Sequence, residues 1–464
     1  MSAAGSTALP EQRDSGLPTS DEVVAGLPWR WRVHGSIFLI GGLGFMFDAW
    51  DVALNGFLIP LLMEEWGLSA GQAAWIATSN LLGMAVGAFT WGGIADRIGR
   101  KRAFSLTLLT FAIFTVLGAL SPNLVVFCVF RFLAGFGLGG CIPVDYALVG
   151  EFTPRRQRGR VLTAMDGWWP VGVSLCGLVS AWLIAQFGDW RLILLVMVLP
   201  ALLVFFVRLY VPESPLYLAR AGRHEEADRV VAALVRRTGG TQTRWRLPEP
   251  GEGGTQTGTA WAGQLLALWR YSPRITATSW LLFIAILLLY YAALTWLPNI
   301  LRQQGMENHA AFLVTSAMTG VGIIGVLVCA VLVDRTGRKW MLGATSVLAA
   351  VFLVAFAVLL EQGTELSLAA RLCILAFGFL IQMSIPALYT YVSELYPTEL
   401  RGSGFGWASA ASRVAIGLAP LAFGSLLWPV LGLPLTFALT GALVIVAVLV
   451  MAWSTRETTH EILR

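Results

Sequence analysis

A few charged side chains lie inside long apolar stretches of this 464-residue chain. Asp48 and Asp51 share one such stretch, and their spacing of three puts both carboxyl groups on one face of a helix. A charge inside a bilayer costs about 2.5–3.5 kcal/mol on insertion scales, so its presence needs a reason. A buried carboxylate that gains and loses a cationic partner changes its affinity for protons. We therefore expect Asp48 or Asp51 to exchange a proton.

Arg131, in another apolar stretch, is the expected partner of these aspartates. At about 1.5 Å per helical residue, Asp51 lies about 13 Å from the end of its segment at Pro60. Arg131 lies about 12 Å from the end of its own segment at Asn123. This equal depth predicts an ion pair between two helices. It can open when the acid is protonated, or it can be a fixed pair that locks the helices together.

Arg413 is the deepest cation of the second half. A guanidinium can bind a carboxylate through two parallel hydrogen bonds and does not lose its charge. We expect Arg413 or Arg131 to bind an anionic solute; the alternative for Arg413 is a bond to backbone carbonyl groups. Asp145 and Asp166 lie about one turn from the ends of their segments, and we expect them to form a latch with the basic run 155–160.

Aromatic and amide side chains too deep for the membrane interface form a second candidate group. Flat rings with hydroxyl groups suit a planar heteroaromatic solute, through offset stacking and hydrogen bonds. For any single residue, packing in the core remains the alternative. The candidates for substrate binding, besides Arg131 and Arg413, are Trp50, Trp168, Trp169, Tyr290, Tyr291, Trp296, Gln382 and Tyr389.

The elements that must position these residues are membrane helices. Hydrophobic residues make up 56% of the chain and charged residues 13%, whereas a soluble domain averages about 25% charged. Several apolar runs exceed the roughly 18 residues that cross a bilayer as a helix. Hydropathy predicts an all-α integral membrane protein with twelve transmembrane helices, at 35–60, 72–95, 103–121, 124–150, 161–187, 190–210, 275–301, 310–333, 340–361, 368–393, 403–430 and 432–454.

The spans divide into two six-helix halves, residues 35–210 and 275–454, joined by a polar linker at 211–274. We expect a disordered cytoplasmic tail at 1–34 and a cytoplasmic tail at 455–464. Basic residues of the short loops gather on one side, which marks that side as cytoplasmic, together with both termini and the linker. The basic excess is therefore a signal of membrane topology, and we expect no nucleic-acid partner.

Two motifs recur between the halves. An Asp-Arg-x-Gly-Arg-Lys loop begins at Asp96 and again at Asp334, 238 residues later. A Glu-x-x-Pro-x-x-x-Arg-Gly loop begins at Glu151 and again at Glu394, 243 residues later. Nearly equal offsets predict an internal duplication, with a solute held between pseudo-symmetric halves. The charged positions of these loops are Asp96, Arg97, Arg100, Glu151, Arg158, Asp334, Arg335, Arg338, Glu394 and Arg401.

These loops, with the Pro-Glu-Ser-Pro sequence that begins at Pro212, resemble the sugar-porter-like signatures of the major facilitator superfamily. The resemblance covers residues 35–455 and implies the major facilitator fold. It also implies that the loop charges act as gating latches between neighbouring helices. Ala330 stands where the second copy would have the glycine found at Gly92, so that copy is slightly degraded.

Phe47–Val52, Gly137–Gly140, Tyr290-Tyr291 and Trp296–Pro298 are similar to the corresponding segments of bacterial niacin transporters. This resemblance implies proton-coupled import of nicotinate, or of a close aromatic monocarboxylate, by rocking of the halves in the cell (cytoplasmic or inner) membrane. The alternatives are transport of a benzoate-type acid or a sugar, export, and facilitated diffusion without protons. We expect a monomer surrounded by membrane lipid.

Other chemistries lack their sequence signals. Gly135-x-Gly137-x-x-Gly140 fits a dinucleotide-binding pattern, but it lies in an apolar helix and not after a strand, so we expect close helix packing instead. Neither a P-loop nor the catalytic motifs HExxH and GxSxG occur. The spacing of the five cysteines predicts neither disulfides nor a metal site. We expect no enzyme activity, no cofactor and no metal.

Overall fold

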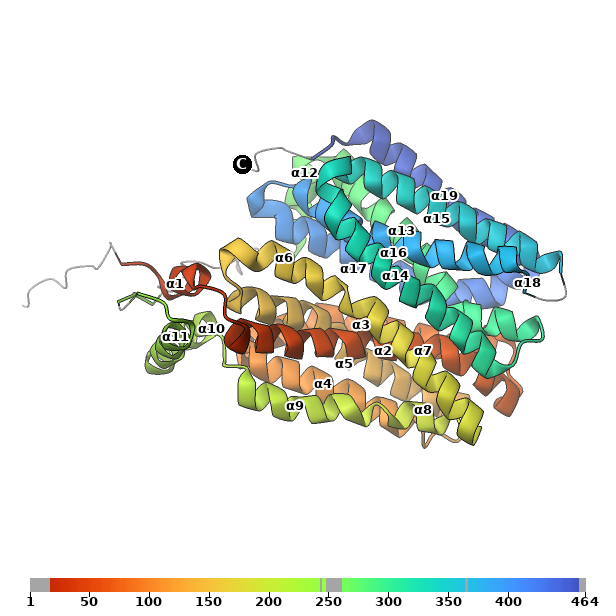
Figure 1. Ribbon diagram of the computed structural model, residues 1–464, viewed down its shortest axis with the longest axis horizontal. Helices are drawn as coiled ribbons and strands as arrows, with labels where there is room; N and C mark the ends of the chain where they lie inside the picture. Colours follow the sequence, from red (N-terminus) through yellow and green to blue (C-terminus); the bar gives the residue numbers. More distant parts are fainter. Residues whose placement is uncertain (1–16, 243, 248–260, 364–365, 459–464) are drawn as a thin grey trace, which may run out of the picture.

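Two bundles of long helices, one from each half of the chain, lie side by side (Figure 1). This computed structural model describes residues 17–242, 244–247, 261–363 and 366–458. The first bundle contains α2 (Ser36–Trp66), α3 (Ala70–Ile98), α4 (Arg100–Gly118), α5 (Leu124–Phe152), α6 (Arg155–Asp166), α7 (Trp168–Phe187), α8 (Arg191–Leu195) and α9 (Val198–Tyr210). The second contains α13 (Pro273–Gln303), α14 (Asn308–Thr336), α15 (Arg338–Glu361), α16 (Leu368–Glu394), α17 (Thr398–Ala422), the π-helical turn η2 (Phe423–Leu427), α18 (Trp428–Leu431) and α19 (Leu433–Ser454).

The remaining helices gather at one end of the bundles, on the left of Figure 1. They are α1 (Ser20–Gly26), the π-helical turn η1 (Trp31–Gly35), α10 (Pro215–Arg220), α11 (His224–Thr238) and α12 (Trp261–Tyr271). We call this end the linker face and the opposite end, which carries α18, the far face.

The twelve-helix, all-α architecture is confirmed, and its sixth span is interrupted. Within the described residues, eleven helices are long and apolar enough to cross a membrane. The sixth expected span, 190–210, is instead the shorter helices α8 and α9. Pro200 explains the interruption. In a regular helix its ring would clash with the carbonyl group of Val196, four residues earlier, and Val196 lies where α8 ends and α9 has not yet begun.

Polar residues mark where several of the apolar helices begin. The Ser69 hydroxyl accepts a hydrogen bond from the backbone N–H of Gln72 at 3.3 Å, at the start of α3. The Asn123 side chain does the same for Val126 at 3.1 Å, at the start of α5. These N-caps satisfy backbone donors that a first helical turn leaves unpaired. The same device begins α13 at Ser272 and α16 at Ser367.

Glycines set the closest helix contacts at equivalent places in the two halves. A Cβ atom at Gly135 of α5 would lie 1.9 Å from the carbonyl oxygen of Asn80 on α3. A Cβ atom at Gly378 of α16 would lie 2.0 Å from the carbonyl oxygen of Met318 on α14. Only residues without a side chain allow backbones to approach this closely. The glycine-rich run of α5 is therefore a packing surface, as expected.

Residues 17–34 differ from the disordered tail expected for 1–34; residues 1–16 lie outside the described part. Thr19 caps α1, with its hydroxyl accepting from the N–H of Glu22 while the Glu22 carboxylate accepts from the N–H of Thr19. Val23, Val24 and Leu27 are buried. Pairing with the linker fixes the segment, since Ser20 N–H donates to Arg246 O at 2.9 Å. The Thr-x-x-Glu capping box before an apolar pair was the available sequence signal.

Candidate substrate and proton site

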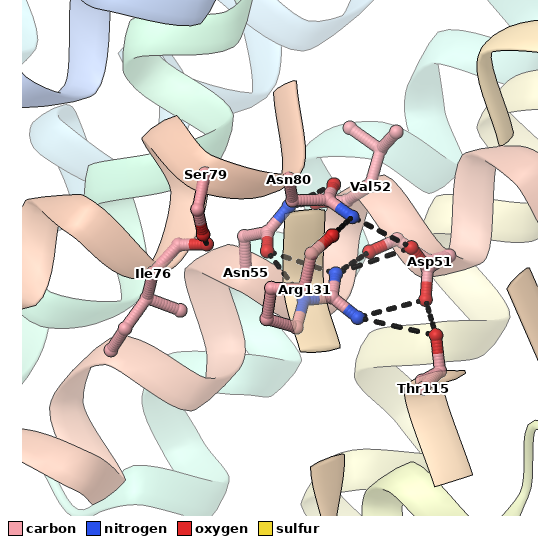
Figure 2. A network of polar contacts seen from close by, with 8 residues as sticks. All are labelled: Asp51, Val52, Asn55, Ile76, Ser79, Asn80, Thr115 and Arg131. Atoms are coloured by element: carbon pink, nitrogen blue, oxygen red, sulfur yellow. Dashed lines mark hydrogen bonds and ion pairs between the residues drawn. The ribbon is translucent and has the colours of Figure 1, made fainter. Parts of the chain in front are cut away.

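Asp51 and Arg131 form a fully buried ion pair between α2 and α5 (Figure 2). Arg131 Nη1 lies 3.0 Å from Asp51 Oδ1, and both side chains have 0% exposure. Arg131 Nη2 donates to Asp51 Oδ2 at 3.2 Å and to the Asp51 backbone carbonyl at 2.9 Å. The ion pair expected from equal depth is therefore present.

Three neutral side chains complete the hydrogen bonds of this pair, as Figure 2 shows. Thr115 of α4 donates to Asp51 Oδ1 at 2.7 Å, and Asn80 of α3 donates to Asp51 Oδ2 at 3.2 Å. Asn55 Oδ1 accepts from Arg131 Nε at 3.2 Å and from Nη2 at 2.9 Å. Every guanidinium nitrogen has an acceptor, so Arg131 has no nitrogen left for a solute in this conformation.

Asp48 lies one turn from Asp51 and has a different environment. Its side chain is fully buried, yet neither carboxyl oxygen accepts a hydrogen bond from an N–H or O–H group in the described structure. The Cys141 thiol of α5, a weak donor, interacts with this carboxyl group, and Arg413 of the second half lies within electrostatic range of it. An isolated buried carboxylate is costly. Asp48 is therefore an acid whose charge is not compensated by a bonded partner.

Asp145 and Asp166 do not form the expected latch with residues 155–160. Both oxygens of Asp145 are buried without a hydrogen-bond partner. Asp166, at the end of α6, accepts a hydrogen bond from the Tyr146 hydroxyl of α5. The arginines of the basic run lie along α6, where Arg155, Arg156 and Arg160 are exposed. The acids face the bundle, so the two groups of residues do not meet.

The hydroxyl group of Tyr290 joins the two halves at the centre of the molecule. Trp169 Nε1 of α7 donates to the Tyr290 oxygen at 3.1 Å, and Gln382 Nε2 of α16 donates to the same atom at 3.1 Å. The rings of Trp169 and Tyr291 are 6.3 Å apart, and those of Tyr290 and Tyr291 are 5.5 Å apart. Four of the expected aromatic and amide candidates therefore meet at the interface between the halves.

Arg413 of α17 is a half-buried cation with a buried, unused donor. Its Nη1 has no hydrogen-bond partner among the described residues. Asp48, Tyr291 and Tyr389 all lie within electrostatic range of its charge. Tyr389 stacks on Phe283 with ring centroids 5.6 Å apart. The guanidinium is thus placed among tyrosines, next to an uncompensated acid.

Three other candidates lie apart from this group. Trp296 packs against Phe423 and Trp428 near the far face, with ring centroids 5.6 and 5.7 Å apart. Trp168 lies against Gly42, where a Cβ atom would come within 2.3 Å of its Nε1. Trp50 is 5% exposed, and its indole N–H has no partner in the described structure. Trp296 and Trp168 therefore have packing roles in this conformation.

Comparison with known proteins gives the family. The model of the Major Facilitator Superfamily matches residues 41–420 and 307–463. The chain belongs to this superfamily. The transporter is 34% identical over 392 residues to the niacin transporter NiaP of Acinetobacter baylyi, which covers 84% of this chain and 86% of that protein. It is 31% identical over 417 residues to the gallate transporter of Pseudomonas putida, covering 89% of each.

A solved structure supports the same fold. The inward-open xylose transporter XylE of E. coli aligns with a TM-score of 0.74 and 20% identity, covering 93% of this chain and 98% of that one. The resemblance to the superfamily and to bacterial niacin transporters is confirmed, and the chain is a multi-pass membrane transporter and not an enzyme.

The halves of the transporter are in contact between the site and the far face. A Cβ atom at Gly56 of α2 would lie 2.6 Å from the carbonyl oxygen of Leu294 on α13. The rings of Phe57 and Phe312, on α2 and α14, are 5.0 Å apart. Glu64 and Arg302 form an ion pair at 3.4 Å at the ends of α2 and α13. By contrast, Trp169, Tyr389 and Arg413 are partly exposed.

The repeated loops at the linker face form matching ion pairs, one within each half. Arg100 Nε lies 3.4 Å from Glu151 Oε1, and Arg338 Nε lies 2.6 Å from Glu394 Oε2. Burial raises the pKa of Glu151, and a hydrogen bond with Ser214 and the charge of Arg100 oppose this shift. These pairs join the end of the fourth helix of each half to the start of the third.

Among the loop side chains that the structure describes, the remaining ones show no such pairing. Arg97 and Arg335 are exposed, and Arg158 Nη2 donates to the carbonyl oxygen of Thr153 at 3.4 Å. Arg401 has two buried nitrogens, Nε and Nη2, without a hydrogen-bond partner in the described part of the chain. The side chains of Asp96 and Asp334 lie outside what the structure describes.

Two further glutamates belong to these loops. Glu213, after the first half, accepts from the backbone N–H of Lys101 at 3.1 Å. Glu457, after the second half, accepts from that of Arg338 at 2.9 Å. Each carboxylate thus lies at the N-terminus of a membrane helix, where negative charge is favoured. Their positions relative to the repeated loops were the signal that could have revealed them.

Proposed function

We propose that the transporter imports nicotinate, or a close aromatic monocarboxylate, together with protons by alternating access. The observation that carries this proposal is the contrast between two arginines. Arg131 is saturated by Asp51 and Asn55, whereas Arg413 keeps a buried donor without a partner beside Tyr291 and Tyr389. A guanidinium among aromatic rings is complementary to the carboxylate and ring of such a solute.

The hydrogen-bond polarity of Tyr290 adds specificity. Its oxygen accepts from both Trp169 and Gln382, so its own proton remains available for donation. A ring that carries an acceptor, such as the pyridine nitrogen of nicotinate, can take this bond while Arg413 holds the carboxylate. Trp169 and Tyr291 supply the flanking rings.

Asp48 is the residue that we propose for the transported proton. Its carboxyl group is bonded to no cation, so binding a proton removes an uncompensated buried charge. Arg413, within electrostatic range, favours the ionised form when the solute leaves. The solute anion and the Asp48 carboxylate thus compete for one guanidinium. Asp51, held by four hydrogen bonds, has the structural role of a fixed pair.

The linker face is assigned to the cytoplasm, with both termini, in the inner membrane of a bacterial-type cell. Its basic loops follow the positive-inside pattern. Contact between the halves on the far side and partial exposure of Arg413 and Tyr389 support access from the linker face. The Arg100–Glu151 and Arg338–Glu394 pairs are proposed as latches of this state. Because one chain holds the whole site, the transporting unit is a monomer in lipid.

A hydroxylated benzoate is the second candidate solute. The transporter is 31% identical to a gallate transporter and 30% identical to the 4-hydroxybenzoate transporter PcaK of Acinetobacter baylyi. Such an acid also presents a carboxylate to Arg413, and its ring hydroxyl can accept from Tyr290. The two candidates differ in the group that faces Tyr290, not in the arginine.

Uptake of labelled nicotinate into proteoliposomes with an alkaline interior tests the proposal. Protein-free liposomes correct for passive entry of the neutral acid. We expect protein-dependent accumulation above that at equal pH, with competition by nicotinate stronger than by 4-hydroxybenzoate, benzoate or glucose. Stronger competition by 4-hydroxybenzoate would assign the second candidate. Equal uptake with and without the gradient would reject proton coupling.

A further inference from the structure

Asp145 is a second buried acid that neither the Asp51–Arg131 pair nor the proposed solute site uses. Its side chain has 0% exposure, and both oxygens lack a hydrogen-bond partner in the described structure. A Cβ atom at Gly44 would lie 3.2 Å from Asp145 Oδ2. The carboxyl group therefore projects from α5 against α2, one helical turn from Asp48. Gly44 leaves space for the ring of Phe104 and for this carboxyl group.

Among the described residues, the cation that acts on this pair of acids is Arg413, and it acts on Asp48. The charged group that faces Asp145 is Asp48, which has the same sign. Asp48 in turn faces Asp51, Cys141 and Arg413. The Cys141 thiol, on the same helix as Asp145, lies within range of both acids and of Thr107 on α4. Tyr146, next in sequence to Asp145, bonds to Asp166 instead.

Two neighbouring buried acids with this environment cannot both be ionised at low cost. Neither carboxylate would be bonded to a cation, and the two charges would repel each other. The pair therefore holds at least one proton. Because either acid can carry it, a proton can move between them without creating a second buried charge.

The positions of the acids give this transfer a direction. Asp145 lies seven residues before the end of α5 at Phe152, about 10 Å from the linker face. Asp48 lies twelve residues after the start of α2 at Ser36, about 18 Å from the same face. A proton that moves from Asp48 to Asp145 therefore approaches the side that we assign to the cytoplasm.

We infer that Asp145 is the inner proton acceptor of the transport cycle, which takes the proton from Asp48 and releases it at the linker face. In this step the O–H bond of Asp48 breaks and an O–H bond forms on the Asp145 carboxylate. Asp48 becomes the anion near Arg413, and the total charge of the pair is unchanged. Release then transfers the proton from Asp145 to water. The inference rests on the proposed proton coupling.

Two transport assays on Asp145→Asn test this role. Asparagine has the shape of the protonated acid but cannot release a proton. We expect gradient-driven accumulation of nicotinate to fall by about tenfold or more, the scale on which a positioned proton-transfer group acts. Exchange of labelled for unlabelled nicotinate at equal pH, which requires no net proton release, should stay near the wild-type rate. Retained accumulation would overturn the inference, as would equal loss of both activities.

Asp189→Asn is the matched control, because this carboxylate is exposed and lies far from the pair, beside Arg191. It should keep both activities. Infrared difference spectroscopy of the purified protein separates failure of the inference from failure of the proposed function. The carbonyl band of the protonated carboxyl group in the pair should be lost or shifted in Asp145→Asn but unchanged in Asp189→Asn. Absence of that difference overturns the role of Asp145, whatever the wild-type transporter does with nicotinate.

Discussion

Two aspartates one turn apart on α2 have opposite surroundings. Asp51 accepts hydrogen bonds from Arg131, Thr115 and Asn80, and its charge is matched by the guanidinium. Asp48 is equally buried but has no N–H or O–H donor, and the cation that acts on it, Arg413, belongs to the other half of the molecule. The difference shows that burial of a charge does not by itself indicate a transport role. A satisfied pair stabilises a helix contact, whereas an unsatisfied acid can respond to a proton or a solute.

The same contrast divides the arginines. Arg131 lies within one bundle and bonds only to residues of that bundle. Arg413 comes from the second bundle and acts on Asp48 of the first. Rocking of the halves leaves the Arg131 contacts unchanged but alters those of Arg413. The part of the site that can couple solute, proton and motion is therefore the part that spans the interface.

The largest expected effect comes from breaking the satisfied pair. Arg131→Ala leaves Asp51 as a buried, uncompensated carboxylate, and removal of one partner of such a pair costs about 3–5 kcal/mol. We expect a clearly lower unfolding temperature in detergent and reduced abundance in the membrane. Asp48→Asn, by contrast, removes no bond and should unfold at or above the wild-type temperature.

The double variant Asp51→Asn with Arg131→Gln provides the control for this prediction. It removes both charges together, so it should recover part of the stability that Arg131→Ala loses. If Asp48→Asn destabilised the protein as strongly as Arg131→Ala, the contrast between the two aspartates would be wrong.

Arg413→Gln tests the other side of the comparison and should affect binding more than stability. Loss of a hydrogen bond to a charged group costs about 1.5–3 kcal/mol, which weakens nicotinate binding by about tenfold to a hundredfold. Ligand-induced thermal stabilisation of the purified protein measures this effect, because a ligand raises stability according to its affinity. Arg413→Lys keeps the charge but not the planar donors, so its stabilisation by nicotinate should lie between those of the wild type and Arg413→Gln. Unchanged stabilisation in both variants would exclude Arg413 from the solute site.

Much of the architecture could be predicted because membrane helices follow from local composition. The duplicated loops around Asp96 and Asp334 gave the two halves, and equal depth gave the Asp51–Arg131 pair. The break in the sixth span could also be predicted from the sequence, since the ring of Pro200 would clash with the carbonyl group of Val196 in a regular helix. The docked segment at 17–34 was missed because its stability comes from contacts with the linker that composition does not reveal.

The details of the site were less predictable, because they depend on which faces of distant helices meet. Asn55 and Asn80 are ordinary polar residues in apolar runs, and their role appears only when α2, α3 and α5 are packed. Tyr290 and Trp296 are six residues apart on one helix, yet one reaches the interface and the other packs near the far face. The residue types and their spacing do not predict which of the two reaches the interface.

Tyr290→Phe sharpens the comparison at the level of a single hydrogen bond. The ring and its packing remain, but the donor proposed for the solute is lost, a change worth about 0.5–1.5 kcal/mol. Thermal stabilisation by nicotinate should fall by that amount, whereas stabilisation by benzoate, whose ring has no acceptor, should change less. Equal losses for both acids would mean that the hydroxyl group only orders Trp169 and Gln382.

The smallest effect on stability is expected at the Glu64–Arg302 ion pair. Like the interaction between Arg413 and Asp48, this pair connects the two halves, but it is exposed to solvent. The Glu64 side chain is 64% exposed and that of Arg302 is 38% exposed, and such pairs contribute about 0–1 kcal/mol. Glu64→Gln should therefore leave the unfolding temperature nearly unchanged. Because the contact joins the two halves at the far face, its loss should still shift the balance between conformations. Labelling of a cysteine introduced near Arg302 should become faster, and more so at low salt, where the wild-type pair is strongest. A change in unfolding temperature as large as that of Arg131→Ala would show that exposure does not separate the two kinds of ion pair.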